Sequence, residues 1–498
     1  MNAPLRRVAV AVLVLFGLLL VNVNYIQVVK AGEYQNDSRN QRVLLRVYER
    51  ERGPILAGGG AQVLAESVET EGRFRYLRRY PGGELGPRAW APVTGFFSFV
   101  YGSTGIERSA NEVLSGESDE LFVRRISDLV TGRDPQGAAV SLTLLPEAQA
   151  AALDGLGGQQ GAVVALDPRS GAVLAMASTP SYDPNALSSF EPEQVRAAYA
   201  QLSEDDDDPL VNRAVSAVYP PGSIFKVVTA AAALESGNYT VDSQIPAPDR
   251  LDLPQTSADL TNFGEASCGG GGTLSLLQSL EVSCNTSFGQ LGLDIGGQAI
   301  AEQAQEFGFG EELEVPLPVE ASVFPAELNP PQTAQSAIGQ FDVRVTPLQA
   351  AMIASGVAND GVVMRPYLVD RVLAPDLSVV DEADPQQLNR AVSTETAEAL
   401  QQMMTAVVNG PRGTGRAAAI PGVTVAGKTG TAQRGAGQDP HVWFIGFAPA
   451  EDPRVAVAVV VEDGGRLGAG ASGGRLAAPI ARSVLQAALR AVPAEEDE

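Results

Sequence analysis

The sequence predicts an α+β protein in which one antiparallel sheet, built from distant segments of the chain, is packed by helices. Strand-like segments lie at both ends of residues 161–461, and the segments between them have the features of helices. An apolar run near the N-terminus adds a membrane-spanning helix. Residues 31–150 lack a regular pattern, which indicates a separate N-terminal region.

The N-terminus carries the membrane signal. Arg6 and Arg7 precede an uninterrupted apolar run at 8–21, and apolar residues continue among polar ones as far as Val29. The extended run reaches the roughly 20 residues that a span needs, and no convincing cleavage site of a signal peptide follows it. We therefore expect residues 1–30 to be a short cytoplasmic tip and an uncleaved anchor, with the rest of the chain outside the cytoplasm.

The region that follows contains few regular elements. Apolar and polar residues alternate over 39–48, which predicts an extended strand. Glycines at 58–60 predict a loop, and residues 110–114 a short helix.

Regular elements begin at residue 161. Residues 162–166 and 172–177 flank a turn at 167–171 and predict a β-hairpin. The sequence predicts helices at 224–234, 273–282, 346–358, 395–408 and 476–489. Ser393 is a suitable N-cap for the fourth of these helices. Strands are expected at 423–432, 442–447 and 455–461, with Trp443 and Phe444 in the core.

Composition excludes several functions. The chain has 35 Lys and Arg against 59 Asp and Glu, a net charge of −24 that argues against nucleic acid as a partner. It has a single histidine, His441, which a Ser-His-Asp hydrolase would have to use; we expect it at a loop or strand end instead. One His and two Cys are a poor supply of zinc ligands. We therefore expect no metal and no cofactor.

One candidate nucleophile stands at the start of a predicted helix. The segment Tyr219-Pro-Pro-Gly-Ser-Ile-Phe-Lys226 places Ser223 and Lys226 three residues apart, on one helix face. A serine there lies beside free backbone N–H groups, and a buried, uncharged lysine amine is a suitable base for it. An ordinary buried helix with a polar cap would also give the four residues 223–226. Ser223 and Lys226 alone are therefore weak evidence for a catalytic site.

Two later motifs favour the catalytic interpretation of Ser223 and Lys226 over the structural one. Ser283-Cys-Asn285 follows a predicted helix, where a turn presents both polar side chains together. Lys428-Thr-Gly-Thr431 lies in a predicted strand, where Gly430 permits close approach of a ligand and Lys428 and Thr429 suit a carboxylate. In this order and spacing the three form the S-x-x-K, S-x-N and K-T-G set of penicillin-recognising serine enzymes.

Further segments resemble the class B penicillin-binding proteins along nearly the whole chain. These segments are Arg52-Gly-x-Ile55, Gly105-Ile-Glu107, Pro180-Ser-Tyr-Asp-Pro-Asn185, Asn212-Arg213, Gly339-Gln340, Thr346-Pro-Leu-Gln349 and Ala426-Gly-Lys-Thr-Gly-Thr-Ala-Gln433. The resemblance implies a non-catalytic N-terminal pedestal for dimerisation or interaction, and a penicillin-binding domain with a five-stranded antiparallel sheet. Leu56-Ala-Gly-Gly-Gly60 departs from the family's usual continuation, which affects the pedestal and not the chemistry.

The resemblance also implies a D,D-transpeptidase mechanism on peptidoglycan stem peptides, with β-lactams as inhibitors. Ser223 would form the acyl-enzyme, Lys226 would take its proton, and Ser283 would relay the proton with Lys428 close by. Asn285 would hold the donor amide, and Lys428, Thr429 and Thr431 its terminal carboxylate. The backbone N–H groups of Ser223 and Thr431 would form the oxyanion hole.

Two cysteines, Cys268 and Cys284, lie in the segment expected outside the cytoplasm. We expect them to form a disulfide that fixes Ser283 and Asn285, which flank Cys284. Two free thiols are the alternative.

The interpretation is a membrane-anchored class B penicillin-binding protein of a bacterial cell membrane. We expect an anchor at 1–30, a pedestal at 31–150, a transpeptidase domain at 151–492 and an acidic tail at 493–498. By resemblance, a SEDS-type glycan polymerase or other divisome or elongasome proteins would be partners. Two alternatives stay open: a D,D-carboxypeptidase or β-lactamase that uses water as acceptor, and a non-catalytic β-lactam sensor or divisome scaffold.

Overall fold

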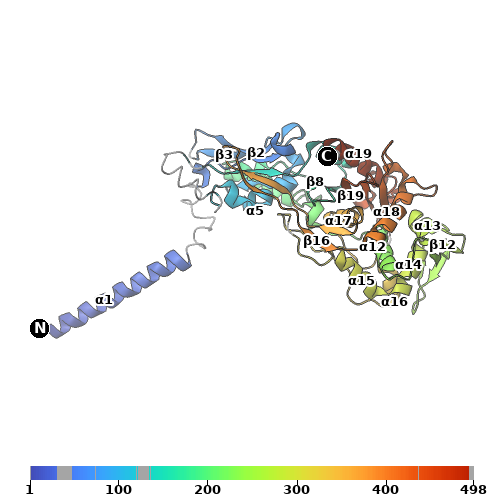
Figure 1. Cartoon of the computed structure of the whole chain (residues 1–498). Helices are drawn as coiled ribbons and strands as arrows, with labels where there is room; N and C mark the ends of the chain where they lie inside the picture. Colours follow the sequence, from blue (N-terminus) through green and yellow to red (C-terminus); the bar gives the residue numbers. More distant parts are fainter. Residues whose placement is uncertain are drawn as a thin grey trace.

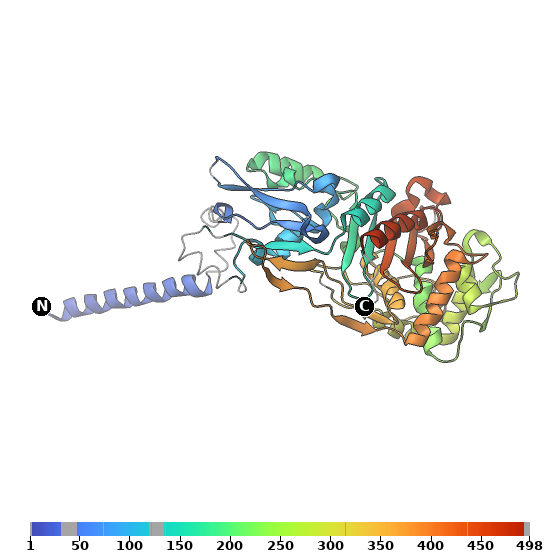
Figure 2. The same ribbon diagram turned by 45° about the horizontal axis from the view of Figure 1, so that its top comes forward.

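A computed structural model describes residues 2–30, 47–72, 74–118, 121, 134, 136–313, 315–435 and 437–492. Figures 1 and 2 show a helix at the N-terminus, a pedestal region next to it, and a larger domain that contains the three motifs. The acidic tail expected at 493–498 lies outside the described residues.

The larger domain is organised around a five-stranded antiparallel sheet of order β17-β18-β19-β7-β8. Its strands are β7 (Gly161–Leu166), β8 (Val173–Thr179), β17 (Ala426–Ala432), β18 (His441–Ala448) and β19 (Val455–Val461). This confirms the predicted sheet built from both ends of the domain. The edge strand β17 carries the Lys428 motif.

Both faces of this sheet are buried, because successive side chains of a strand point to opposite faces. Val457 and Val459 of β19 pack in a core with α8 (Pro146–Leu156) and α19 (Ala477–Ala491). Ala456 and Ala458 pack on the other side, in a core with α12 (Lys226–Glu235) and α17 (Pro347–Ala358). Every residue of β19 is buried, as expected for a central strand between two helical layers.

The helical layer that contains α12 and α17 continues through the middle of the chain. Its other helices are α13 (Leu276–Glu281), α14 (Asn285–Ile295), α15 (Gly297–Glu306), α16 (Pro330–Ser336) and α18 (Thr394–Asn409). The remaining strands here are β9 (Gln244–Pro246), β10 (Arg250–Asp252), β11 (Asp259–Thr261), β12 (Thr273–Ser275), β13 (Val362–Met364) and β16 (Gln387–Arg390).

Most of the predicted elements are present. The hairpin, the helices at 346–358, 395–408 and 476–489, and the three C-terminal strands are confirmed, and Ser393 accepts a hydrogen bond from the backbone N–H of Thr396. Trp443 and Phe444 are fully buried, and His441 is the first residue of β18.

One prediction needs correction. The helix expected at 273–282 begins as strand β12, because this segment pairs with β9, and Ser275 then caps the shorter α13. The strand expected at 39–48 lies mostly outside the described residues, and Tyr48 is helical.

The pedestal contains a six-stranded sheet of order β15-β14-β6-β1-β2-β3. Its strands are β1 (Ile55–Ala57), β2 (Gln62–Glu69), β3 (Tyr76–Arg79), β6 (Ala139–Leu142), β14 (Val369–Leu373) and β15 (Val379–Glu382). The last two come from the middle of the larger domain, and Figure 2 shows them in orange beside the blue and cyan pedestal strands. The boundary expected at residue 150 therefore does not separate the two sheets.

Short elements complete the pedestal and its junction with the larger domain. They are β4 (Phe97–Ser98), β5 (Gly102–Ser103), α4 (Ala91–Thr94), α5 (Gly105–Ser109), α6 (Asn111–Leu114), α9 (Asn185–Ser188), α10 (Pro192–Ser203) and α11 (Arg213–Ser216).

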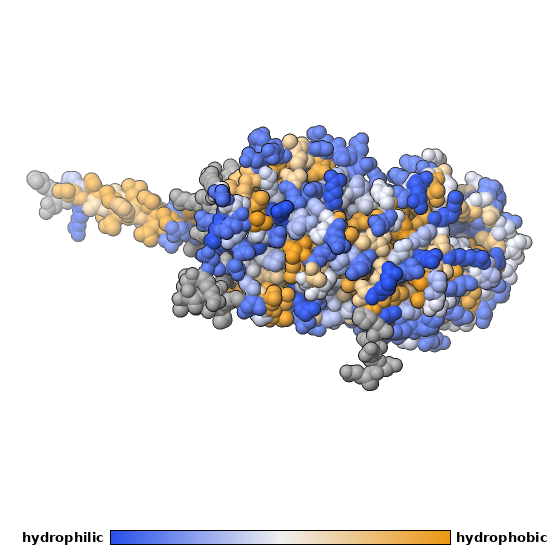
Figure 3. Space-filling model, turned by 90° about the horizontal axis from the view of Figure 1, so that it is seen from above, coloured by the Kyte–Doolittle hydropathy of each residue, from blue (hydrophilic) through white to orange (hydrophobic). Residues whose placement is uncertain are grey.

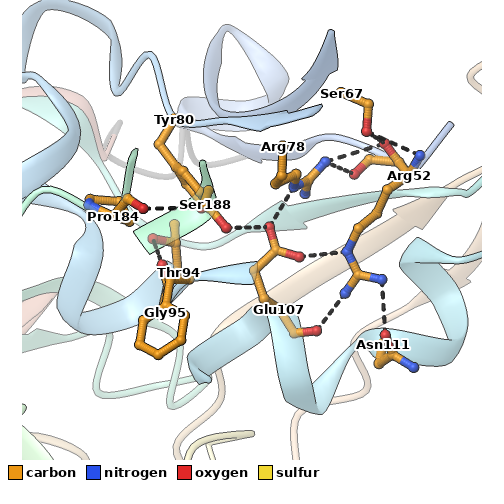
Figure 4. A network of polar contacts seen from close by, with 12 residues as sticks. Arg52, Ser67, Arg78, Tyr80, Thr94, Gly95, Glu107, Asn111, Pro184 and Ser188 are labelled. Carbon is orange, nitrogen blue, oxygen red and sulfur yellow. Dashed lines mark hydrogen bonds and ion pairs between the residues drawn. The ribbon is translucent and has the colours of Figure 1, made fainter. Parts of the chain in front are cut away.

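A buried cluster of charges holds the pedestal together (Figure 4). Glu107 is fully buried; one of its carboxylate oxygens accepts a hydrogen bond from Arg52 Nε at 2.6 Å and the other from Arg78 Nε at 2.5 Å. The hydroxyl of Tyr80 also donates to Glu107, at 3.1 Å. Burial raises the pKa of Glu107, but Arg78 and Arg52 outweigh burial and hold the pKa below its ordinary value.

The N-terminal helix α1 (Asn2–Asn24) continues into one turn of π-helix at Tyr25–Val29. Residues Ala3–Gln27 are long and apolar enough to cross a membrane by length and composition. Figure 3 shows their apolar side chains projecting from a body whose visible surface mixes polar and apolar residues. This helix is compatible with a single membrane anchor.

Candidate active site

Ser223 lies on a tight turn at the start of α12. Residues Gly222–Phe225 form one 3-10 turn, and the α-helix begins at Lys226. Gly222 has φ 54°, and a Cβ there would lie 2.9 Å from the backbone oxygen of Thr431. Glycine is therefore needed for the serine turn to pack against the edge strand β17.

Contacts to the sheet fix the chain just before this turn. The indole N–H of Trp443 donates to the backbone oxygen of Pro220 at 3.1 Å. The Tyr219 hydroxyl and Arg213 Nε both donate to Glu462 Oε1, at 2.7 and 2.8 Å. The turn that carries Ser223, the candidate nucleophile, is thus held by Trp443 of β18 and by Glu462, which directly follows β19.

The second motif forms the tight connection between α13 and α14. Ser283 adopts φ 58°, a conformation that few residues other than glycine take without strain. Asn285 is the first residue of α14. The connection turns both side chains toward α12 and β17.

The Ser283 hydroxyl lies between two lysine amines. Lys428 Nζ donates to Ser283 Oγ at 2.8 Å, and Lys226 Nζ lies 3.3 Å from the same oxygen. Lys226 Nζ also donates to Ser283 O and Asn285 Oδ1, each at 2.8 Å. A neutral amine has two N–H donors and one lone pair. The two shorter contacts use the donors of Lys226, which leaves its lone pair for a hydroxyl proton.

Both amines are fully buried, and burial disfavours their charged forms. Burial lowers the pKa of Lys428 to about 7. Burial, and secondly the charge of Lys428, holds the pKa of Lys226 well below its ordinary value. Within the described part of the chain, no carboxylate forms an ion pair with either lysine. The site can therefore supply a neutral amine near pH 7.

The third motif forms the opposite wall. Thr429 Oγ1 and Thr414 Oγ1 lie 2.7 Å apart, and Thr431 is half-buried. A Cβ on Gly430 would lie 2.9 Å from Trp443 Cβ and 3.0 Å from Ile224 Cγ2. The protein's own packing therefore already requires glycine at this position, whether or not a ligand approaches.

These walls enclose a cavity of about 630 Å³. Its lining includes Ser223, Ser283, Asn285, Thr429, Gly430 and Thr431. Lys226 and Lys428 lie behind this wall and reach the cavity through Ser283 and Asn285. Among the described contacts, no hydrogen bond joins Ser223 Oγ to Lys226 Nζ, and such bonds often form only when substrate is bound. His441 is not part of the lining.

Cys268 and Cys284 are joined by a disulfide, with their Cα atoms 5.7 Å apart. Cys284 stands between Ser283 and Asn285, so the bond ties the second motif to the loop after β11.

Sequence reasoning missed three residues around the cavity. Thr414 contacts Thr429, Arg412 donates to the backbone oxygen of Cys268, and Asn262 accepts hydrogen bonds from the start of α14. Each lies in a loop and acts through a residue far away in the sequence. No local pattern marks such residues.

Comparisons with known proteins agree with this site. Residues 161–486 match the family described as penicillin binding protein transpeptidase domain, and residues 52–140 match the penicillin binding protein A dimerisation domain. The chain is 48% identical over 500 residues to the peptidoglycan D,D-transpeptidase PbpA of Mycolicibacterium smegmatis, covering 98% of this chain and 99% of that protein. It is 46% identical over 506 residues to PbpA of Mycobacterium tuberculosis, covering 99% and 100%.

Solved structures give the same result. The ceftriaxone acyl-enzyme of penicillin-binding protein A from M. tuberculosis superposes with a TM-score of 0.85 at 44% identity, covering 89% of this chain and 100% of that chain. The penicillin G acyl-enzyme of the same protein superposes with a TM-score of 0.82 at 45% identity, covering 88% of this chain and 100% of that chain. With the three motifs brought together around one cavity, these matches show that the chain belongs to the penicillin-binding protein transpeptidase family.

Proposed function

We propose that this protein is a D,D-transpeptidase that cross-links peptidoglycan stem peptides through an acyl-enzyme on Ser223. One observation carries the proposal: the Ser283 hydroxyl lies between two buried lysine amines, and half-buried Ser223 at the start of α12 lines the same cavity. This arrangement activates a serine without histidine or carboxylate.

The reaction proceeds in two transfers. Lys226 takes the hydroxyl proton of Ser223, whose Oγ attacks the carbonyl between the last two D-alanines of the donor. The C–N bond breaks, Ser283 relays the proton to the departing D-alanine amine, and an ester on Ser223 remains. An amine of a neighbouring stem then attacks the ester carbonyl. The ester C–O bond breaks, the new amide is the cross-link, and a proton lost by the attacking amine restores the hydroxyl of Ser223.

The cavity wall positions the donor. As the edge strand of its sheet, β17 has backbone groups that can pair with an extended peptide. Thr429 and Thr431 bind the terminal carboxylate, with Thr414 hydrogen-bonded to Thr429 and Lys428 behind them. Asn285 holds the donor amide, and the backbone N–H groups of Ser223 and Thr431 stabilise the oxyanion.

β-Lactams acylate the same serine because they resemble the donor. Intact-mass spectrometry with benzylpenicillin tests this for the detergent-solubilised chain. We expect one penicillin per molecule, mapped to Ser223 and absent in Ser223→Ala. Rapid turnover of the drug without an adduct would indicate a hydrolase. The absence of both adduct and turnover would contradict the proposal that the protein is an enzyme.

We further propose that α1 anchors the protein in a bacterial cell membrane with the catalytic domain outside. The disulfide between Cys268 and Cys284 supports this orientation, because such bonds persist in oxidising compartments. A membrane-impermeant maleimide should label a cysteine added at exposed Leu377 in intact spheroplasts; labelling only after lysis would contradict the orientation.

The partners that we propose are a SEDS-type glycan polymerase or other divisome or elongasome proteins. The described side chains of α1 are exposed, so its apolar surface is open to lipid or to other membrane helices. Photo-crosslinking from Leu13 in native membranes should capture a polytopic protein, and capture of lipid alone would contradict this partner.

A further inference from the structure

Asn262 lies in the connection between β11 and the short turn Phe263–Glu265, more than twenty residues before the second motif. Its side chain is buried, with a relative exposure of 6%. Its amide oxygen accepts two backbone N–H groups at the start of α14, from Asn285 at 2.8 Å and from Thr286 at 3.2 Å.

These N–H groups are donors for which a helix offers no partner of its own. A side chain at the N-cap position normally accepts them, but the N-cap of α14 is Cys284, which makes no such bond. Asn262 therefore caps α14 from a separate segment of the chain.

The capped turn carries Asn285, whose side-chain amide is held at one end by the same segment and at the other end by Lys226 of α12. Asn285 Nδ2 donates to the backbone oxygen of Thr261 at 3.0 Å, while Asn285 Oδ1 accepts from Lys226 Nζ at 2.8 Å. The disulfide ties Cys284 to the far end of the segment; among the described contacts its sulfur lies 3.4 Å from the Thr286 hydroxyl but accepts no backbone N–H of the helix.

We propose that Asn262 is a positioning residue for acylation: its amide oxygen fixes the first turn of α14 and thereby holds the Asn285 amide against Lys226. This inference rests on the proposed function, because it assigns Asn262 to the step in which Lys226 takes the proton of Ser223. Although Asn262 is among the residues that line the cavity, its amide oxygen is directed at the start of α14, and the role proposed for it acts through Asn285.

A double-mutant cycle tests this route. The second-order rate of acylation by a fluorescent penicillin and the thermal midpoint are measured for the full chain in detergent, for Asn262→Ala, Asn285→Ala and the double variant. We expect Asn262→Ala to slow acylation roughly 10- to 100-fold, because small misplacements of catalytic groups have effects of this size. In the Asn285→Ala background the same change should cost less than about threefold, since residues that act as a unit are non-additive.

The thermal midpoint separates positioning from stability. Asn285→Ala keeps the backbone N–H that Asn262 accepts, so Asn262→Ala should lower the midpoint equally in both backgrounds. Asn329→Ala is the matched control: it removes an amide that caps α16, and it should lower the midpoint without slowing acylation. Additive losses of acylation in the cycle would overturn the proposal.

Asn262→Asp serves if the alanine variant does not fold. The carboxylate keeps the acceptor for both N–H groups, so the alkaline plateau of the acylation rate should stay close to wild type. Its charge should raise the pKa of Lys226. The other charged groups near this lysine are Lys428, which faces it from β17, and Asp259 and Arg412 of the cavity lining. The acidic limb of the profile should then move to higher pH.

A lost plateau in a folded Asp variant would contradict positioning by Asn262. These outcomes also differ from a failure of the proposed function. If wild type itself formed no adduct on Ser223, the function would be wrong before Asn262 was tested.

Discussion

The protein contains two buried clusters of basic side chains, of which one has a carboxylate partner and the other has none among the described residues. In the pedestal, Arg52 and Arg78 share the carboxylate of Glu107. In the active site, Lys226 and Lys428 share the hydroxyl of Ser283, and none of the described carboxylates pairs with them. Burial is nearly complete in both places.

The difference lies in which charge state each cluster favours. Glu107 keeps the pedestal cluster ionised, and its multiple hydrogen bonds make it a structural junction between β3 and α5. Without a carboxylate, burial pushes the lysines toward the neutral amine that a proton acceptor requires. A buried cation with a partner supports the fold, and one without a partner is available for chemistry.

The largest expected effect is the loss of activity in Lys226→Met. This change approximately keeps the length of the side chain but removes the proposed base, so acylation should fall by up to about 10⁴-fold. The variant should stay folded, because the change breaks no ion pair and an apolar methionine removes the cost of burying an amine, which offsets the loss of two hydrogen bonds. Stopped-flow acylation and urea unfolding measure both quantities. If the variant were strongly destabilised but its folded molecules were acylated at the wild-type rate, Lys226 would have a structural role and not a catalytic one.

Glu107→Gln should do the opposite. It leaves two buried guanidinium groups without their carboxylate, and breaking a buried ion pair costs about 3–5 kcal/mol. Folded molecules should still acylate at the wild-type rate. Urea unfolding measures the loss, and Glu193→Gln on the exposed surface of α10 is the control with little effect. An unchanged stability would show that Glu107 is not a structural junction.

Loss of the disulfide should have a somewhat smaller effect. Cys268 and Cys284 are separated by 16 positions, and a loop of that length contributes about 3 kcal/mol in the chain-entropy model. We expect the double Cys→Ser variant to lose stability, and wild type in reductant to match it. Equal unfolding midpoints with and without reductant would contradict this expectation.

The two clusters should also change stability in opposite pH ranges. Because the folded pKa of Lys428 is lowered to about 7, the unfolded chain binds more protons above that pH. Stability should therefore rise with pH from about 7 toward 10.5, by at most about 1.4 kcal/mol per pH unit for each lysine. Glu107, with a lowered pKa, should lose its contribution only as pH falls below about 4.5. Unfolding curves of wild type and Lys428→Met should separate in slope across the alkaline range, and parallel curves would contradict the lowered pKa.

Local patterns predicted the elements that local forces decide. The all-apolar β19, the hairpin and the Ser393 cap were correct because each depends on neighbouring residues. The strand β12 and the transfer of β14–β15 to the pedestal sheet depend on distant partners, so the sequence did not indicate them. The same holds for Asn262 and Thr414, whose roles exist only after folding. The three motifs were found by their resemblance to a known family and by their order. The contact of both lysines with Ser283 could not be predicted, because only the fold brings these residues together.

The most direct test uses the small number of lysines in the chain, which are Lys30, Lys226 and Lys428. Selective lysine labelling therefore gives an NMR spectrum with three side-chain signals, assigned with Lys226→Met and Lys428→Met. A titration should place Lys428 near 7 and Lys226 well below its ordinary pKa of 10.5, and the pKa of Lys226 should rise when Lys428 is removed. Two buried lysines that both titrate near 10.5 would show that the active-site amines are charged at pH 7 and would contradict the account.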